Sequence, residues 1–309
     1  MHEPQDVTLE TLEARLTALL PQEYQDTYED VEPTPMGSAG LKYAAVGTVA
    51  WNEIWQSFCD LAMAGGPPHK GRLLEPATPS EIAAQPERHD EVVREIQRGV
   101  ALVTDLPADP SPRPGWVRVE CDSAGMAGWL LRAIVMENVS AHAEETSLDL
   151  PAGPGYRVDK EIKNVITVIA KTCHYWSGHM WRFEQRAIGD LFAEMNATSP
   201  LVAPALAIHL AGADGSRAHA AAADAIRAAT GLAVAPLPYV HWIGVACPNV
   251  KAALWMMRMM VASNVLARRE DTTLCVPVNP VSDPGGTIVA ASLARVHRFA
   301  IESGRIPPA

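Results

Sequence analysis

The densest group of chemically active side chains lies in KTCHYWSGHMW, residues 171 to 181. This stretch holds a lysine, a cysteine, two histidines and three aromatic residues. An imidazole can accept or donate a proton near neutral pH, and an ammonium group attracts anions. We therefore take His174 and His179 as candidate proton carriers and Lys171 and Tyr175 as candidate substrate-binding residues.

A helix is predicted over the residues that lead into this stretch, with its polar side chains on one face. That row consists of Lys160, Asn164, Thr167, Lys171, His174 and Gly178, spaced by four, three, four, three and four residues. A solvated helix face is the simplest explanation of the row. In an acidic protein, however, lysine, asparagine and histidine favour an anionic ligand. Lys160 and Asn164 are thus added as candidate substrate-binding residues, and Ser177-Gly178 is predicted to end the helix.

A second candidate is the loop GGPPHKG, residues 65 to 71, which contains His69 and Lys70. Glycines and a rigid Pro-Pro pair can bring backbone and a cation against a phosphate or carboxylate. An ordinary turn explains the loop equally simply, and neither a Walker A motif nor GxGxxG occurs in the chain. We predict that His69 contributes to proton transfer and Lys70 to anion binding, with both closing the site.

Two cysteines raise the alternative of a metal site. Cys121 and Cys247 each end a predicted strand just before a helix start, where partial positive charge would lower a thiol pKa. If the fold brought them together with His174 or His179, these residues could bind zinc or iron. No HExxH or CxxC pair supports this alternative, and packing explains the cysteines as well. No cofactor is therefore predicted, and a metal remains the alternative.

The chain resembles itself over a distance of 126 residues. Without a gap, residues 116–151 and 242–277 are identical at 14 of 36 positions, including two tryptophans, a cysteine and an arginine. Chance would give about two or three at ordinary composition. Upstream, residues 89–103 resemble 219–234 more weakly, at an offset of 130. We infer an internal duplication.

Each copy predicts the order α-β-β-α-β-α, with GVALV (99–103) or GLAV (231–234) as its first strand. The fold class is therefore α+β, with two tandem pseudo-symmetric lobes and a helical N-terminal segment. The predicted segments are 1–80 (N-terminal helical extension and loop), 81–180 (first repeat), 181–211 (helical connector) and 212–309 (second repeat). A ligand is expected between the lobes.

Composition limits the partners. The net charge is −11, which argues against nucleic acid and anionic membranes, and no apolar run is long enough to span a bilayer. Five cysteines without a paired framework and an acidic N-terminus predict a cytoplasmic protein. The sequence leaves a homo-oligomer open.

The predicted function is an enzyme, a hydrolase or lyase, acting on a small anionic metabolite such as a carboxylate or phosphate. One alternative is a metal-dependent hydrolase or lyase with Cys and His ligands. The other is a non-catalytic protein that binds or senses a small molecule.

Overall fold

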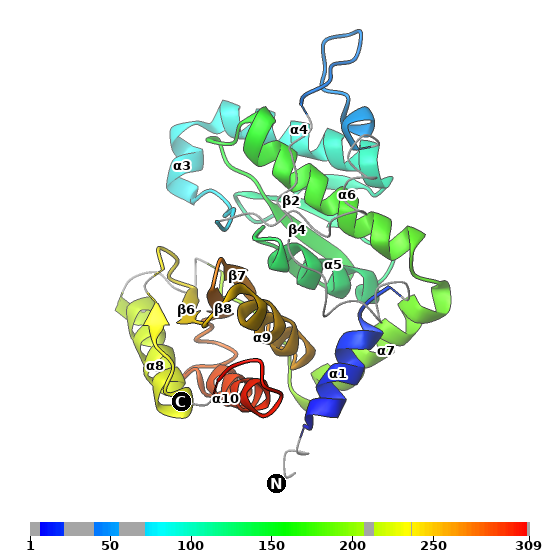
Figure 1. Ribbon diagram of the computed structural model, residues 1–309. Coiled ribbons are helices and arrows are strands. Elements are labelled where there is room, and N and C mark those ends of the chain that lie inside the picture. The colour runs from blue at the N-terminus through cyan, green and yellow to red at the C-terminus, as the bar shows by residue number, and fades with distance from the viewer. Residues whose placement is uncertain (1–6, 22–39, 56–71, 207–212, 236, 308–309) are drawn as a thin grey trace. The chain divides into compact units, whose positions relative to one another are not determined.

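The computed structural model describes residues 7–21, 40–55, 72–206, 213–235 and 237–307. They form two compact units, shown in Figure 1. The first unit comprises residues 21–190, and the second comprises residues 1–20 together with 191–309. Both units combine helices with an antiparallel sheet of four strands, so the predicted α+β class is confirmed.

The first unit has its sheet strands in the order β1-β2-β4-β3, each antiparallel to its neighbour. The strands are β1 (Ala108–Pro110), β2 (Trp116–Glu120), β3 (His142–Glu144) and β4 (Ser147–Pro151). The helices are α3 (Pro79–Ala84), α4 (Pro86–Thr104), α5 (Ala124–Met136) and α6 (Lys163–Gly178), the last preceded by a π-helical turn η2 (Val158–Ile162). α4 packs on β1 and β2, α5 packs on β3 and β4, and α6 packs on both helices.

The core of the first unit follows from alternation along its strands. Val117 and Val119 of β2 are fully buried, whereas Arg118 and Glu120 between them are half-buried. Side chains on one face of the sheet therefore enter the core beneath α4 and α5. The other face carries charged residues.

The second unit repeats this arrangement with the strand order β5-β6-β8-β7. Its strands are β5 (Val234–Ala235), β6 (Trp242–Ala246), β7 (Arg268–Glu270) and β8 (Thr273–Pro277). Its helices are α1 (Leu9–Ala18), α8 (Ala213–Thr230), α9 (Val250–Ala262) and α10 (Thr287–Glu302). The long helix α7 (Arg182–Thr198) contains the boundary between the units.

Strand β6 is buried on both faces over residues 242–245. Gly244 stands where Arg118 stands in β2, and residues 242–245 are all buried. A side chain at Gly244 would meet the Ala235 carbonyl oxygen at 3.1 Å and the Thr273 methyl at 2.9 Å. The close packing around Gly244 therefore leaves no room for a charged side chain like that of Arg118.

Two details of the predicted element order are wrong. GVALV is not a strand, because it forms the last turns of α4, whose buried face runs through Val93, Ile96 and Val100 with helical spacing. The first strand is β1, and it enters the sheet at Ala108. Each unit also contains a short strand that the sequence did not reveal, β3 or β7, which makes the order α-β-β-α-β-β-α.

The predicted C-terminal end of α6 is correct, and α1 begins at a side-chain cap. α1 is an amphipathic helix with Leu12 and Leu16 buried, capped by the Thr8 hydroxyl. α6 ends at Gly178, as Ser177-Gly178 predicts. No helix in the part of the chain that the structure describes is long and apolar enough to cross a membrane.

Candidate functional site

Two histidines meet at the end of α6. The Nε2 atoms of His174 and His179 lie 3.0 Å apart, and their ring centroids are 4.8 Å apart at 72°. His174 belongs to the last turn of the helix, and His179 caps it with a backbone N–H that donates to the Tyr175 carbonyl oxygen at 3.1 Å. Both imidazoles are half-buried. One nitrogen of the pair must donate and the other accept, so the two rings share one proton.

Aromatic rings surround the histidine pair. Trp55 presents its edge to His174 at 5.9 Å between centroids, and the Tyr175 ring lies 6.3 Å from His174 and 5.6 Å from His179. On the buried side of the same turn, Trp176 packs against Trp129, with 5.8 Å between their ring centroids. These contacts hold the imidazole rotamers in place and lower the local polarity.

Lys171 does not lie on an open surface. Its side chain is 5% exposed, and its Nζ donates to Glu137 Oε1 at 2.5 Å. Desolvation lowers the pKa of Lys171, and the Glu137 carboxylate acts in the opposite direction. The ion pair joins the end of α5 to the middle of α6, so Lys171 already has an anionic partner within the protein.

The predicted polar row does not converge on one point. Lys160 is exposed and contacts Glu161 at 3.4 Å, in the π-helical turn that precedes α6. At about 1.5 Å per residue, Lys160 lies on the order of 20 Å along the axis from His174. Asn164 is half-buried one turn later, and the Thr167 hydroxyl is occupied by the Lys163 carbonyl oxygen. A small ligand that touches His174 therefore cannot also reach Lys160.

Cys121 is buried and Cys247 is half-buried. Burial raises the pKa of Cys121 to about 12 and that of Cys247 to about 11, which overrides the expected influence of the helix starts. Among the described residues, no group of three His, Cys, Asp or Glu side chains could hold a metal ion. Cys121 and the two histidines belong to the first unit and Cys247 to the second, so the metal alternative stays a prediction.

Two predicted site residues, His69 and Lys70, lie outside the described residues. The site that the structure defines therefore consists of His174, Tyr175 and His179, with Trp55 beside them.

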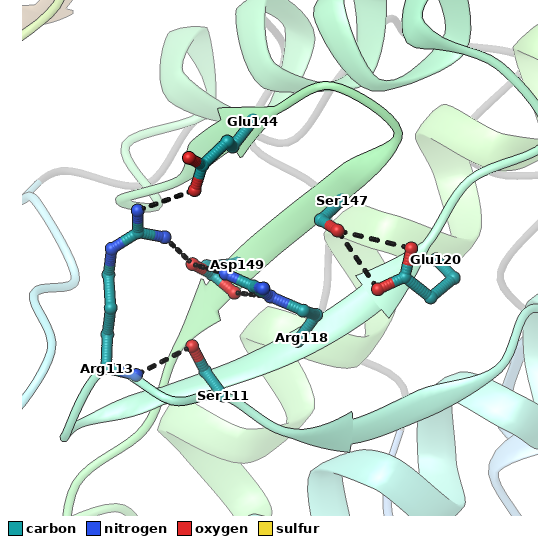
Figure 2. A network of polar contacts seen from close by, with 7 residues as sticks. All are labelled: Ser111, Arg113, Arg118, Glu120, Glu144, Ser147 and Asp149. Atoms are coloured by element: carbon teal, nitrogen blue, oxygen red, sulfur yellow. Dashed lines mark hydrogen bonds and ion pairs between the residues drawn. The ribbon is translucent and has the colours of Figure 1, made fainter.

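A second polar cluster, which the sequence did not reveal, lies on the charged face of the first sheet (Figure 2). Asp149 is 1% exposed and accepts from Arg113 Nη1 at 2.5 Å and from Arg118 Nε at 3.0 Å. Arg113 also donates to Glu144 at 2.8 Å. Burial acts to raise the pKa of Asp149, but the hydrogen bonds from Arg118 and Arg113 outweigh it and lower the pKa.

The charges of this cluster cancel, since two guanidinium groups face two carboxylates. Nearby, burial lowers the pKa of His142, and the charge of Arg113 acts in the same direction. His142 lies opposite Asp149 in the sheet, and the Asp149 and Glu144 carboxylates act to raise its pKa. The cluster therefore ties β2, β3 and β4 to the loop before β2. It leaves no net charge to attract a ligand.

The second unit replaces this cluster with aromatic packing. Arg268 is fully buried, with its guanidinium 4.6 Å from the centroid of Tyr239 and 4.9 Å from that of Trp242. It donates to Glu270 at 2.7 Å. A guanidinium between two ring faces is a cation–π arrangement that stabilises the fold.

Comparison with protein families, with curated proteins and with solved structures found no match to this chain. The chemistry of the site therefore has to be argued from its geometry. Two half-buried imidazoles in hydrogen-bond contact, beside a tyrosine ring, are groups that could take part in proton transfer.

Proposed function

We infer that the two units arose by duplication of one α+β unit. The pairing of the central strands supports this, because Trp116 opposite Pro151 recurs 126 residues later as Trp242 opposite Pro277. At the outer strands, Ala108 opposite Val119 recurs as Val234 opposite Val245, again 126 residues later. The offset of 126 thus also covers the region that the sequence comparison aligned at 130.

Backbone and side-chain details support the same inference. Left-handed residues occur at equivalent positions, namely Asp105 and Gly231, Asn138 and Asn264, and Glu145 and Asp271. The helix ends also match: the Thr104 hydroxyl donates to the carbonyl oxygen four residues earlier and accepts from the N–H two residues later, and Thr230 does the same. Packing alone would not require this repetition of detail.

We propose that the protein is an enzyme of the hydrolase or lyase type that acts on a small anionic metabolite at the His174–His179 pair. The observation that carries the proposal is the 3.0 Å contact between the two half-buried Nε2 atoms. One imidazole would accept a proton from the substrate while the other supplies one, and the Tyr175 hydroxyl would orient the bound molecule. In the second unit, Ala300 and Arg305 stand at the equivalent positions, so only one unit would carry this activity.

The charges near the histidine pair support a small anion as the ligand. Lys171 is neutralised by Glu137 and Lys160 lies too far away, so the imidazolium form of the pair would meet the anion itself. A carboxylate or phosphate that fits between two imidazoles and a phenol is a small one. Four described cysteines are free, which supports the proposed cytoplasmic location.

A turnover screen tests the proposal. The full chain is incubated with phosphate monoesters and hydroxycarboxylates, and products are followed by proton NMR. We expect conversion of at least one compound, lost by about 100-fold or more in His174→Ala and in His179→Ala. His219→Ala is the matched control, because His219 is a half-buried histidine of the second unit.

The screen separates the classes of function. Binding without conversion, unchanged by both substitutions, would favour the non-catalytic binding protein and contradict the proposal. Conversion that survives both substitutions would place the chemistry elsewhere.

A further inference from the structure

The spacing of the His174 and His179 nitrogens fits a metal ion as well as a proton. A first-row transition metal binds imidazole nitrogen at about 2.0–2.1 Å. Two such bonds at a right angle place the nitrogens about 3.0 Å apart, and a tetrahedral angle places them about 3.4 Å apart. The observed separation is 3.0 Å. The separation of the two nitrogens is therefore compatible with a metal in place of the shared proton.

The rings are also held in position before any ligand arrives. His174 is fixed by the last turn of α6, and His179 by its backbone hydrogen bond to that turn. Trp55 lies against one ring, and Tyr175 lies near both. Because these contacts already restrict the rotamers, binding a metal costs little further side-chain entropy.

We propose that His174 and His179 together bind a divalent transition-metal ion, Ni²⁺, Cu²⁺ or Zn²⁺. Imidazole suits these three ions, and the right-angle geometry fits Ni²⁺ and Cu²⁺ best. The net charge of −11 attracts cations to the protein. The proposed site contains no cysteine, which distinguishes it from the Cys/His metal site predicted from the sequence.

The second unit serves as an internal reference. At the end of α10, Ala300 and Arg305 replace the two imidazoles, and the Arg305 guanidinium lies 5.3 Å from the centre of the Trp255 ring. We therefore expect one metal per chain rather than two.

The inference does not rest on the proposed enzyme activity, because it needs only the geometry of the two rings. The two ideas are nevertheless linked. A bound metal occupies both Nε2 atoms, so a loaded protein could not transfer a proton through them. If the screen finds turnover, Ni²⁺ should inhibit it; if it finds none, metal binding is still expected.

Calorimetric titrations of the full chain with NiCl₂, CuCl₂ and ZnCl₂ in a non-chelating buffer test the site. His2 is replaced by alanine in every sample, so that its imidazole cannot bind the added metal. We expect one ion per chain, with the affinity reduced in His174→Ala and His179→Ala by at least the 10- to 100-fold that loss of a supporting residue typically costs. His219→Ala should bind as the parent does.

Equal affinity in the parent and in both histidine variants would overturn the proposal, and so would the absence of binding by all three metals. If a variant fails to fold, electron paramagnetic resonance of the Cu²⁺-loaded His2→Ala chain decides instead. Hyperfine coupling to two imidazole nitrogens is the expected spectrum. A spectrum without imidazole coupling would show that the metal is bound elsewhere.

Discussion

Replacing Glu137 by leucine should destabilise the first unit strongly. Lys171 and Glu137 are 5% and 7% exposed, and their charged atoms lie 2.5 Å apart. The substitution leaves the Lys171 ammonium buried among apolar side chains without its carboxylate. Removing one partner of a buried ion pair typically costs about 3–5 kcal/mol.

The ionisation of Lys171 sets an upper limit on this cost. A lysine with an ordinary pKa of 10.5 can avoid a buried charge by releasing its proton, which at pH 7 costs about 4.8 kcal/mol. We therefore expect Glu137→Leu to lose about 3–5 kcal/mol. If the native variant holds Lys171 neutral, the unfolded chain binds one more proton, so the loss should shrink by about 1.4 kcal/mol for each pH unit above 7.

Two double variants act as matched controls. Glu137→Leu with Lys171→Met removes both charges and should recover most of the loss, because apolar residues of similar size often replace a buried pair at little cost. Glu137→Ser with Lys171→His introduces the residues of the second unit, Ser263 and His297. The second unit lacks both the glutamate and the lysine, as expected if these two residues are useful only as a pair.

Hydrogen exchange of the α6 amides in urea, followed by mass spectrometry, measures the free energy of opening of the first unit alone. This avoids assuming that both units unfold together. A loss below about 1 kcal/mol in Glu137→Leu, or an equal loss in the Leu/Met double variant, would refute the importance of the ion pair.

Three further predictions concern packing and pH. Gly286→Ala should lower stability by about 2 kcal/mol or more, measured by thermal unfolding, because φ is +67° and the new Cβ would lie 2.5 Å from Ala222 Cα. Burial lowers the pKa of His89, with the charge of Asp90 opposing it, so the unfolded chain binds this proton more readily. Stability should therefore be complete above about pH 6.5 and fall below it, and His89→Gln should weaken that fall in acid urea titrations. Asp149→Asn should cost about 1–3 kcal/mol in urea unfolding, because two arginines lose their carboxylate.

Each of these predictions can fail. An unchanged unfolding temperature in Gly286→Ala would mean that α8 and α10 move apart easily. The same acid response with and without His89 would assign that response to other groups. A neutral Asp149→Asn variant would show that the arginine cluster contributes nothing measurable, as holds for many exposed ion pairs.

Regular features of the fold were predictable from the sequence because their signals repeat. The alternation in β2, the continuous apolar strand β6 and the glycine at the end of α6 all gave correct elements. The short strands β3 and β7 were missed because three residues carry no periodicity. Their turns begin at Glu145 and Asp271 in the left-handed region, without the Asn-Gly or Asp-Gly pair that marks most such hairpins.

The site was only partly predictable. Helical spacing correctly placed His174 and Lys171 on one face, but it could not show that Glu137, on another helix, neutralises the lysine. Nor could it show that His179, beyond the helix end, turns back toward His174. The alternating charges Arg118 and Asp149 offered a signal for the second cluster, but its third member, Arg113, lies in a loop whose path the sequence does not define.

The most direct test of the proposed site is nitrogen NMR of the histidine rings in the full chain. Nε2 and Nδ1 resonances are assigned with His174→Ala and His179→Ala, and small carboxylates and phosphates are then titrated in. We predict that at least one anion shifts the His174 and His179 resonances saturably and leaves His219 unchanged. Resonances of the pair that stay constant with every anion, or that shift equally with all other histidines, would contradict an anion site at the end of α6.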